Sequence, residues 1–374
     1  MPFNRVTRTL PEMSNFANPS AEPEISHDNT AMHSLTLEPK TDPTALYRYR
    51  DGLYAADLLA TAIVRLDLFS WLNDHPSDQA AICRTLKIQE RPTDVMLTLF
   101  VAMGFLEREK GIFKLTELAR EHLVKTSPWF IGPYYASLKD RPVCKDFLEV
   151  LRTDRPATWG SLRNEKEWAK AMEDEAFAQE FTAAMDCRGV YLGRAVAKAL
   201  DARNRKQLLD IGGGSGIYAC SIVARHPHLK AVVLEKPPVD KVARDAIAKR
   251  GLSDRVTVAA GDMFAGPLPG GFDVHLISNV LHDWAVPAVK RVLAGSFQAL
   301  AHGGLLVIHD AHINADKTGP LHVAEYSAML MHSTAGKCYS VAELEVYLTE
   351  TGFVDMEFIP TAAGRSVMLA RKLT

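Results

Sequence analysis

Cysteine pairs and an excess of positive charge are both missing from this chain of 374 residues. The five cysteines are scattered, and no two of them occur as Cys-x-x-Cys. This pattern argues against a disulfide framework and a structural zinc finger, and it suits a reducing compartment. The chain has 43 basic and 45 acidic residues. We therefore expect no nucleic-acid partner, because binding to phosphates normally needs a basic surplus.

Long apolar runs are missing as well. The longest candidate, Val95 to Leu106, is interrupted by Thr98 and Gly104, and it falls short of the ~20 apolar residues that span a bilayer. The N-terminal segment MPFNRVTRTLPEMSNF lacks the apolar stretch of a secretory signal. These absences predict a cytoplasmic protein without a membrane partner.

The first part of the chain divides into a tail and a small helical domain. Residues 1–43 hold six of the 20 prolines and few large apolar groups, which is typical of a disordered tail. Over residues 44–120, the apolar spacing predicts three helices and then a β-hairpin. These elements cover 56–66, 79–86 and 92–103, with the hairpin turn at Lys110-Gly111. Three helices and a hairpin indicate a winged-helix-like domain.

The helix predicted over 92–103 decides what this domain binds. A winged helix that reads DNA carries basic and amide side chains on its recognition helix. Here the segment reads PTDVMLTLFVAM, which has no basic residue and is nearly continuously apolar. An apolar module of this kind needs a partner surface, so we expect it to serve dimerisation rather than DNA binding.

Two further regions follow. Residues 121–200 are predicted to be a helical connector that contributes to an acceptor pocket, ending in a long helix over 167–200. From residue 201 onward, short β-branched runs alternate with helical stretches, as in QLLDI, AVVLE, VTVAAGD, DVHLIS and GGLLVIHD. Buried parallel strands alternating with helices are typical of α/β proteins. We therefore predict a doubly wound, Rossmann-like sheet over 201–374.

The first predicted strand runs into a glycine-rich turn. Asp210 is followed by Gly212, Gly214 and Gly216 in DIGGGSG, and glycines there let the backbone approach a ligand closely. The spacing is not the GxGxxG of a dinucleotide site, and no Lys-Ser/Thr follows as in a P-loop. Asp210 would repel a pyrophosphate but could accept from an ammonium group or from a water bound to one, so we expect a ligand with an amino acid portion.

Two more acidic positions complete the predicted cofactor site. Glu235 ends the second strand, where a carboxylate can accept both ribose hydroxyls. Asp262 and Met263 follow the third strand and offer an acceptor for an exocyclic amine and an apolar surface for adenine. Ligands of open α/β sheets bind at these carboxyl ends. The ligand that combines an amino acid, ribose and adenine is S-adenosylmethionine.

The motifs DIGGGSG, LEKP, GDMF and SNVLHDW occur in this order. Together they resemble the S-adenosylmethionine-dependent O-methyltransferases typified by plant caffeic acid, acetylserotonin and bacterial polyketide enzymes. The similarity covers most of residues 44–374. It implies a homodimer formed through the N-terminal domain, and an aromatic or polyketide-like acceptor. It also implies that Ser278, four residues before the histidine of HDW, contacts the cofactor beside the glycine loop, Glu235, Asp262 and Met263.

A catalytic pair is predicted at the same sheet edge. Methyl transfer to a hydroxyl requires a base, and a neutral histidine suits a phenol whose pKa is about 10. His282 follows the fourth strand and Asp310 ends the fifth, so neighbouring strands would bring them roughly 5 Å apart. We expect His282 to be the general base and Asp310 to hold its imidazole. Asp283 is expected to point elsewhere, as a charge at a helix N-terminus.

The similarity also implies departures from the usual site. Family members carry two glutamates beside the histidine, whereas this chain has Asp310 and Cys338 at those positions. We expect Cys338 to be a small buried apolar group. The acceptor pocket is predicted to draw on apolar residues at helical spacing. These are Phe181, Met185, Tyr326 and Met329.

Three alternatives stay open at this point. Five histidines (His282, His309, His312, His322 and His332) fall late in the chain, which leaves metal-assisted carbon methylation as one alternative. Among these five histidines no HxH or HxxxH spacing supports a metal site, and strand alternation places His309 on the face opposite Asp310. A non-methylating enzyme of the same fold is the second alternative. A winged-helix regulator that senses S-adenosylmethionine is the third.

Overall fold

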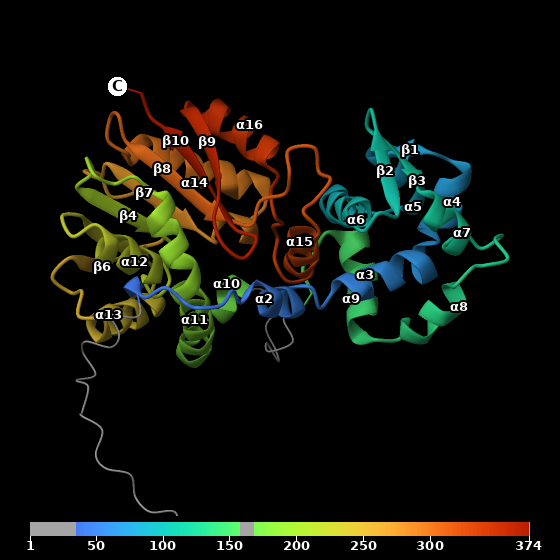
Figure 1. The fold of residues 1–374 in the computed structure, drawn as a ribbon, viewed down its shortest axis with the longest axis horizontal. Coiled ribbons are helices and arrows are strands. Elements are labelled where there is room, and N and C mark those ends of the chain that lie inside the picture. The colour runs from blue at the N-terminus through green and yellow to red at the C-terminus, as the bar shows by residue number, and fades with distance from the viewer. Residues whose placement is uncertain (1–34, 158–167, 374) are drawn as a thin grey trace, which may run out of the picture.

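The computed structural model describes residues 35–157 and 168–373 of the chain. These residues form a helical lobe from the first half of the sequence and a lobe built on a seven-stranded sheet from the second half (Figure 1). Residues 1–34 of the predicted tail lie outside the described residues. Leu35 is 2% exposed and belongs to the core of the sheet lobe, so packing begins before Thr44.

The large sheet has the order β6-β5-β4-β7-β8-β10-β9. Neighbours from β6 to β8 pair in parallel, and β10 is antiparallel to both β8 and β9. The strands are β4 (Gln207–Ile211), β5 (Lys230–Glu235), β6 (Val256–Ala260), β7 (Val274–Ser278), β8 (Leu305–Asp310), β9 (Val354–Pro360) and β10 (Ser366–Arg371). Each parallel strand coincides with a predicted apolar run, whereas the antiparallel pair β9 and β10 was not predicted.

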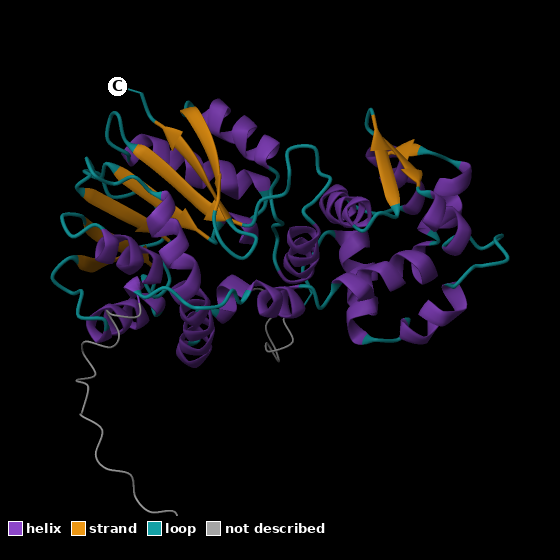
Figure 2. Cartoon of the chain, in the orientation of Figure 1, coloured by secondary structure: helices purple, strands orange, loops and turns teal. Residues whose placement is uncertain are grey.

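Helices cover both faces of this sheet (Figure 2). One face is covered by α11 (Glu175–Ala199), α12 (Ile217–Arg225) and α13 (Val239–Lys249), and the other by α14 (Val286–Ala299) and α16 (Val341–Thr351). The arrangement confirms the predicted α/β class with a mostly parallel sheet. The helix predicted over 167–200 is divided into α10 (Trp168–Ala171) and α11. Asp174 caps α11 by accepting from the backbone N–H of Phe177.

The helical lobe contains a small three-stranded sheet of order β1-β3-β2. Its strands are β1 (Ser77–Asp78), β2 (Leu106–Glu109) and β3 (Ile112–Leu115). The hairpin predicted at Lys110-Gly111 is present, since β2 and β3 pair antiparallel and both turn residues have positive φ. The helices are α2 (Thr44–Asp51), α3 (Ala55–Thr61), η1 (Ala62–Leu66), α4 (Leu68–Asp74), α5 (Gln79–Leu86), α6 (Glu90–Ala102), α7 (Glu117–His122), α8 (Gly132–Tyr135), η2 (Ala136–Leu138) and α9 (Pro142–Thr153).

One helix of the second half of the sequence belongs to the helical lobe. Helix α15 (Leu321–Ser333) lies between the lobes in Figure 1 and packs against α2, α3, α6 and α9. Ten of its thirteen residues are buried, and a helix that is apolar all round must be covered on every side. The packing therefore crosses the boundary predicted at residue 201.

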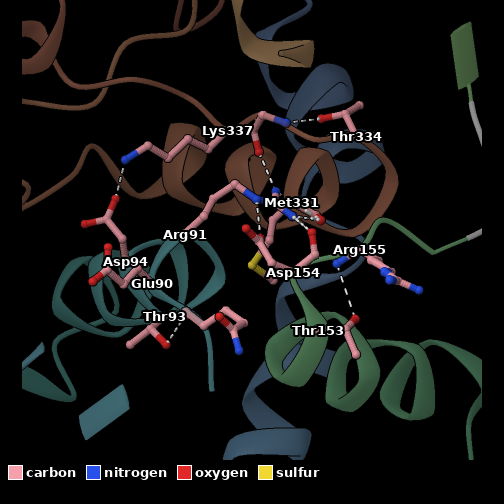
Figure 3. Close-up of polar contacts among 12 residues, drawn as sticks. Glu90, Arg91, Thr93, Asp94, Thr153, Asp154, Arg155, Met331, Thr334 and Lys337 are labelled. Carbon is pink, nitrogen blue, oxygen red and sulfur yellow. Dashed lines mark hydrogen bonds and ion pairs between the residues drawn. The ribbon is translucent and has the colours of Figure 1, made fainter. Parts of the chain in front are cut away.

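Polar contacts fix α6 against the loop that follows α15 (Figure 3). Arg91 donates to the carbonyl of Gly336 at 2.6 Å and pairs with Asp154, just after α9. Lys337 pairs with Asp94 of α6 and, at 2.6 Å, with Glu343 of α16. Lys337 is buried, so its ammonium depends on these two carboxylates for charge compensation. These contacts hold the two lobes in a defined relation. Within the described residues, every helix is too short or too polar to cross a bilayer.

Candidate active site

A cleft lies at the carboxyl ends of the parallel strands, where it is bordered by α11 and α15. It encloses about 1400 Å³, including the part open to solvent. The loops after β4, β5, β6 and β7 form one side of it, and side chains of α11 and α15 form the other. This edge is where open α/β sheets bind their ligands.

The glycine loop and Glu235 form one rigid unit of this cleft. Gly212, Gly214 and Gly216 all have positive φ, a conformation that glycine adopts without steric cost. The Glu235 carboxylate accepts from the backbone N–H of Gly214 at 3.0 Å and of Lys236 at 2.9 Å. Burial raises the pKa of Glu235, and these two N–H groups oppose the rise.

Asp210 does not line the cleft, in contrast to the other predicted cofactor residues. Its side chain is fully buried and lies beneath the loop, since a Cβ on Gly213 would be 2.6 Å from the Asp210 carboxyl. Burial raises the pKa of Asp210 to about 7. The side chain points from the strand to the underside of the turn, so Asp210 does not reach the cleft directly as an acceptor for a ligand ammonium.

The end of β6 presents a carboxylate and an aromatic surface. Asp262, Met263 and Phe264 line the cleft together with Trp284. Asp262 accepts from the backbone N–H of Phe264 at 2.8 Å. The rings of Phe264 and Trp284 meet edge to face with centroids 4.7 Å apart. Trp284 was not predicted as a site residue, although it belongs to the HDW motif.

Ser278, at the end of β7, lines the cleft while it also bonds to a buried histidine. Its hydroxyl lies 2.8 Å from Nδ1 of His309. The His309 ring packs against Tyr218, with centroids 5.2 Å apart. Burial lowers the pKa of His309 to about 3. His309 is therefore neutral and makes its contacts away from Asp310, as strand alternation predicted.

His282 and Asp310 form the predicted pair. Nδ1 of His282 lies 2.5 Å from Oδ1 of Asp310, and both side chains are about 5% exposed. The contact arises because β7 and β8 are neighbours, with Ser278 opposite His309 in the register. Burial opposes ionisation of Asp310, but His282 holds the pKa of that carboxyl well below its usual range. Burial also opposes the charged form of His282, but Asp310 and Asp283 outweigh it and raise the pKa of His282.

The expectation that Asp283 points away from the site was wrong. Its Oδ1 lies 3.7 Å from Nε2 of His282, and the side chain lines the cleft. The segment is the short 3-10 helix η3 (Leu281–Asp283), and α14 begins only at Val286. Asp283 is thus not at the N-terminus of an α-helix. Burial raises its pKa to about 6. The imidazole therefore has a carboxyl group beside each ring nitrogen.

The loop after α15 packs against the backbone of His282. A Cβ on Gly336 would be 2.1 Å from the carbonyl oxygen of His282, and the Thr334 hydroxyl, which donates to the Leu330 carbonyl at 2.9 Å, lies 3.4 Å from that same oxygen. Cys338 is buried, and burial raises the pKa of its thiol well above the usual value. It is a small buried group, as predicted, and its thiol is protonated.

All four residues predicted to contact the acceptor line the cleft. Phe181 and Met185 lie on α11, and Tyr326 and Met329 lie on α15. The Tyr326 ring meets the His282 ring edge on, with centroids 5.6 Å apart. Arg188 was missed, although its spacing after Phe181 and Met185 places it on the same face of α11.

The late histidines do not converge on one point. His312 is bonded to the hydroxyl of Ser366 at 2.7 Å, and His332 pairs with Asp146 at 3.3 Å. His322 lies beside Gly364. Across residues 35–157 and 168–373, no group of three or more His, Cys, Asp or Glu side chains could hold a metal ion. The structure therefore offers no support for a histidine-bound metal.

Known proteins share this fold and sequence pattern. Residues 146–354 match the O-methyltransferase domain. The 3-hydroxy-5-methyl-1-naphthoate 3-O-methyltransferase of Streptomyces sahachiroi is 30% identical over 86% of this chain and 92% of its own length. An O-methyltransferase family 2 protein from Planctomyces limnophilus, solved in complex with apigenin, has a TM-score of 0.82 and 33% identity over 91% of this chain and 98% of its own. Human N-acetylserotonin methyltransferase, solved with S-adenosylmethionine, has a TM-score of 0.57 and 25% identity over 90% of this chain and all of its own.

Proposed function

Since the chain belongs to the S-adenosylmethionine-dependent O-methyltransferase family, we propose that it methylates a hydroxyl oxygen of a small aromatic or polyketide-like acceptor, with His282 as the general base. The observation that carries this proposal is the buried contact of His282 with Asp310 at the floor of the cleft. The acceptor class is supported by the hydroxylated naphthoate for which the Streptomyces relative is named.

The residues at the strand ends fit the cofactor. Each oxygen of the Glu235 carboxylate accepts one backbone N–H, and a carboxylate oxygen can accept a second bond. One acceptor site per oxygen thus remains for the two ribose hydroxyls. Asp262 and Met263 would meet the adenine, while Gly212, Gly214 and Ser278 would border the amino acid portion. Asp210 supports the loop from below rather than touching the ligand.

The chemistry then depends on the His282 side chain. Bound S-adenosylmethionine supplies an electrophilic methyl group on its sulfonium. Asp310 accepts from Nδ1 of His282, which leaves the lone pair on Nε2, facing the cleft. The hydroxyl proton of the acceptor would pass to Nε2 as its oxygen takes the methyl group, whose bond to sulfur would break with the electron pair left on S-adenosylhomocysteine. Asp310 stabilises the resulting imidazolium, and Asp283 adds to that stabilisation when it is ionised.

The helical lobe supports a homodimer rather than a DNA-binding role. Eight of the thirteen residues of α6 are buried, and α15 packs against this helix, so its apolar face is covered within the chain and does not itself require the partner surface that its sequence predicted. Among the described residues, eleven large apolar side chains are strongly exposed; seven of them lie in the helical lobe, and four of these seven fall within residues 44–120. They include Leu46, Tyr49 and Leu53. Such side chains favour a partner surface, and we assign residues 44–120 as the main dimer contact.

The test of the reaction is to locate the transferred methyl group. The purified protein is incubated with S-adenosylmethionine labelled with ¹³C in the methyl group and with a panel of phenols and keto acids. The proposal predicts a methoxy carbon in the NMR spectrum of the product. A label bound to carbon would instead establish carbon methylation, and absence of product with every acceptor would point to a non-methylating activity.

A further inference from the structure

Arg188 projects from α11 into the acceptor side of the cleft. Its Nη1 donates to the hydroxyl of Tyr326 at 3.3 Å. Its Nε is buried without a hydrogen-bond partner. Among the described residues, no carboxylate lies within 4 Å of its guanidinium. Burying a guanidinium without a counterion is costly.

Three other largely buried arginines of the described residues have carboxylate partners. Arg250 pairs with Asp186 at 2.6 Å, Arg91 with Asp154 at 2.6 Å and Arg365 with Asp51 at 3.4 Å. Arg188 has no carboxylate partner among the described residues, and unlike these three arginines it lines the cleft. Its unpaired charge faces the space that a ligand would occupy.

The carboxylates around Arg188 are already engaged. Asp51 accepts from Arg50 at 2.9 Å and also pairs with Arg365. Asp310 is bonded to His282 and to the N–H of Ala311, and Asp283 lies beside His282. The missing counterion of Arg188 is therefore not one of these neighbouring carboxylates.

The Nη2 group of Arg188 defines what the ligand must offer. Nη1 is bonded to Tyr326 and Nε is enclosed by the protein, so Nη2 is the part of the guanidinium that is left without a partner among the described residues. A guanidinium N–H forms its strongest hydrogen bonds with anionic oxygens such as those of a carboxylate. Tyr326 also contacts the ring of His282, so a ligand beside this tyrosine can reach both the guanidinium and the general base.

We propose that Arg188 binds a carboxylate of the acceptor, so that the substrate class is hydroxylated aromatic carboxylic acids. The inference rests on the proposed function. In that function the acceptor hydroxyl contacts His282, and Arg188 would bind a second polar group of the same molecule. The carboxylate bound to Arg188 fixes the orientation of the ring and thereby selects which hydroxyl is methylated.

The experiment compares acids with their carboxamides. Hydroxylated benzoic and naphthoic acids and the matching amides are titrated into the full-length protein with S-adenosylhomocysteine, and kcat and KM are measured with S-adenosylmethionine. Arg188→Met removes the charge, and Arg188→Lys keeps the charge without the planar fork. Arg194→Met is the matched control, because Arg194 lies on the same helix outside the cleft and pairs with Glu38.

The wild type should prefer acids over amides. Arg188→Met should weaken acid binding about 10- to 100-fold, since a hydrogen bond to a charged group is worth about a factor of ten or more, and should change amide binding less than about threefold. Arg188→Lys should recover part of the loss, and Arg194→Met should match the wild type. Unchanged affinity for S-adenosylhomocysteine would show that the variants are folded.

Equal binding of acids and amides by the wild type would overturn the proposal, as would an equal loss of both in Arg188→Met. These results leave O-methylation intact wherever methoxy products still form. Conversely, acids that bind in an Arg188-dependent way but receive no methyl group would overturn the proposed reaction and support the carboxylate site.

Discussion

Replacing Asp310 by Asn should change both the rate of methyl transfer and its pH dependence. Asp310 is buried and lies 2.5 Å from Nδ1 of His282. Asp310 and Asp283 together raise the pKa of His282, whereas burial of the imidazole lowers it. An asparagine of the same size keeps the packing but removes the charge.

The magnitude follows from the lost interaction. A hydrogen bond to a charged group contributes about 1.5–3 kcal/mol, which corresponds to roughly 1–2 pKa units. His282 acts as a base only when it is neutral, so activity falls as pH drops through its raised pKa. In Asp310→Asn that pKa is lower, and the acid limb of kcat should move to lower pH by about 1–2 units.

The plateau rate should fall at the same time. The loss of imidazolium stabilisation predicts a decrease of about 10- to 150-fold in kcat. The asparagine amide can also donate to Nδ1, which favours the tautomer with its proton on Nε2. The assay is a pH profile of kcat with an accepted phenol at saturating S-adenosylmethionine. An acid limb that stays in place, or moves to higher pH, would refute the assignment of Asp310 as the residue that tunes His282.

Three further outcomes are expected. Glu235→Ala should weaken S-adenosylhomocysteine binding by at least tenfold in calorimetry, because charged hydrogen bonds of about 1.5–3 kcal/mol each are lost, and unaltered affinity would contradict the ribose assignment. Gly336→Ala should lower kcat about 100-fold while cofactor affinity is kept, because the new Cβ would be 2.1 Å from the His282 carbonyl and must displace the base; a fully active variant would contradict this. Tyr49→Asp, at a side chain that is 83% exposed, should give the 41.3 kDa monomer in light scattering, whereas the control Val346→Asp should leave twice that mass. An unaffected Tyr49→Asp dimer would exclude α2 from the interface.

The central parallel strands β4, β7 and β8 could be predicted because nearly all of their residues are buried. Such strands read as continuous β-branched runs, and β4 to β8 all coincide with one. β9 was missed because it lies at the sheet edge and most of its residues are partly or fully exposed. Its sequence, VDMEFIP, carries two acidic residues and ends in proline. Nothing local distinguishes it from an irregular segment.

The site residues whose location follows from the end of a strand could be predicted. His282 and Asp310 meet because the strands before them are neighbours, and parallel register follows from the α/β pattern. Asp283 could not be placed, because its direction depends on whether a 3-10 turn or an α-helix follows β7. Arg188 was missed for another reason. A charged residue on a helix is usually solvated, and only the packing of Tyr326 against α11 shows that this one is covered.

The placement of α15 illustrates the same limit. Its apolar residues predict a buried helix, but they do not specify which core covers it. The structure places it against α6, in the lobe formed mainly by the first half of the chain.

The most direct test of the central claim is the methyl-transfer rate of His282→Gln. The variant retains a side chain of similar size beside Asp310 but cannot accept the proton. We predict unchanged affinity for S-adenosylhomocysteine and a kcat lower by about 10²–10⁴, which is the usual contribution of a positioned base. A His282→Gln protein that transfers the methyl group to an acceptor hydroxyl at the wild-type rate would contradict the assignment of His282 as the general base.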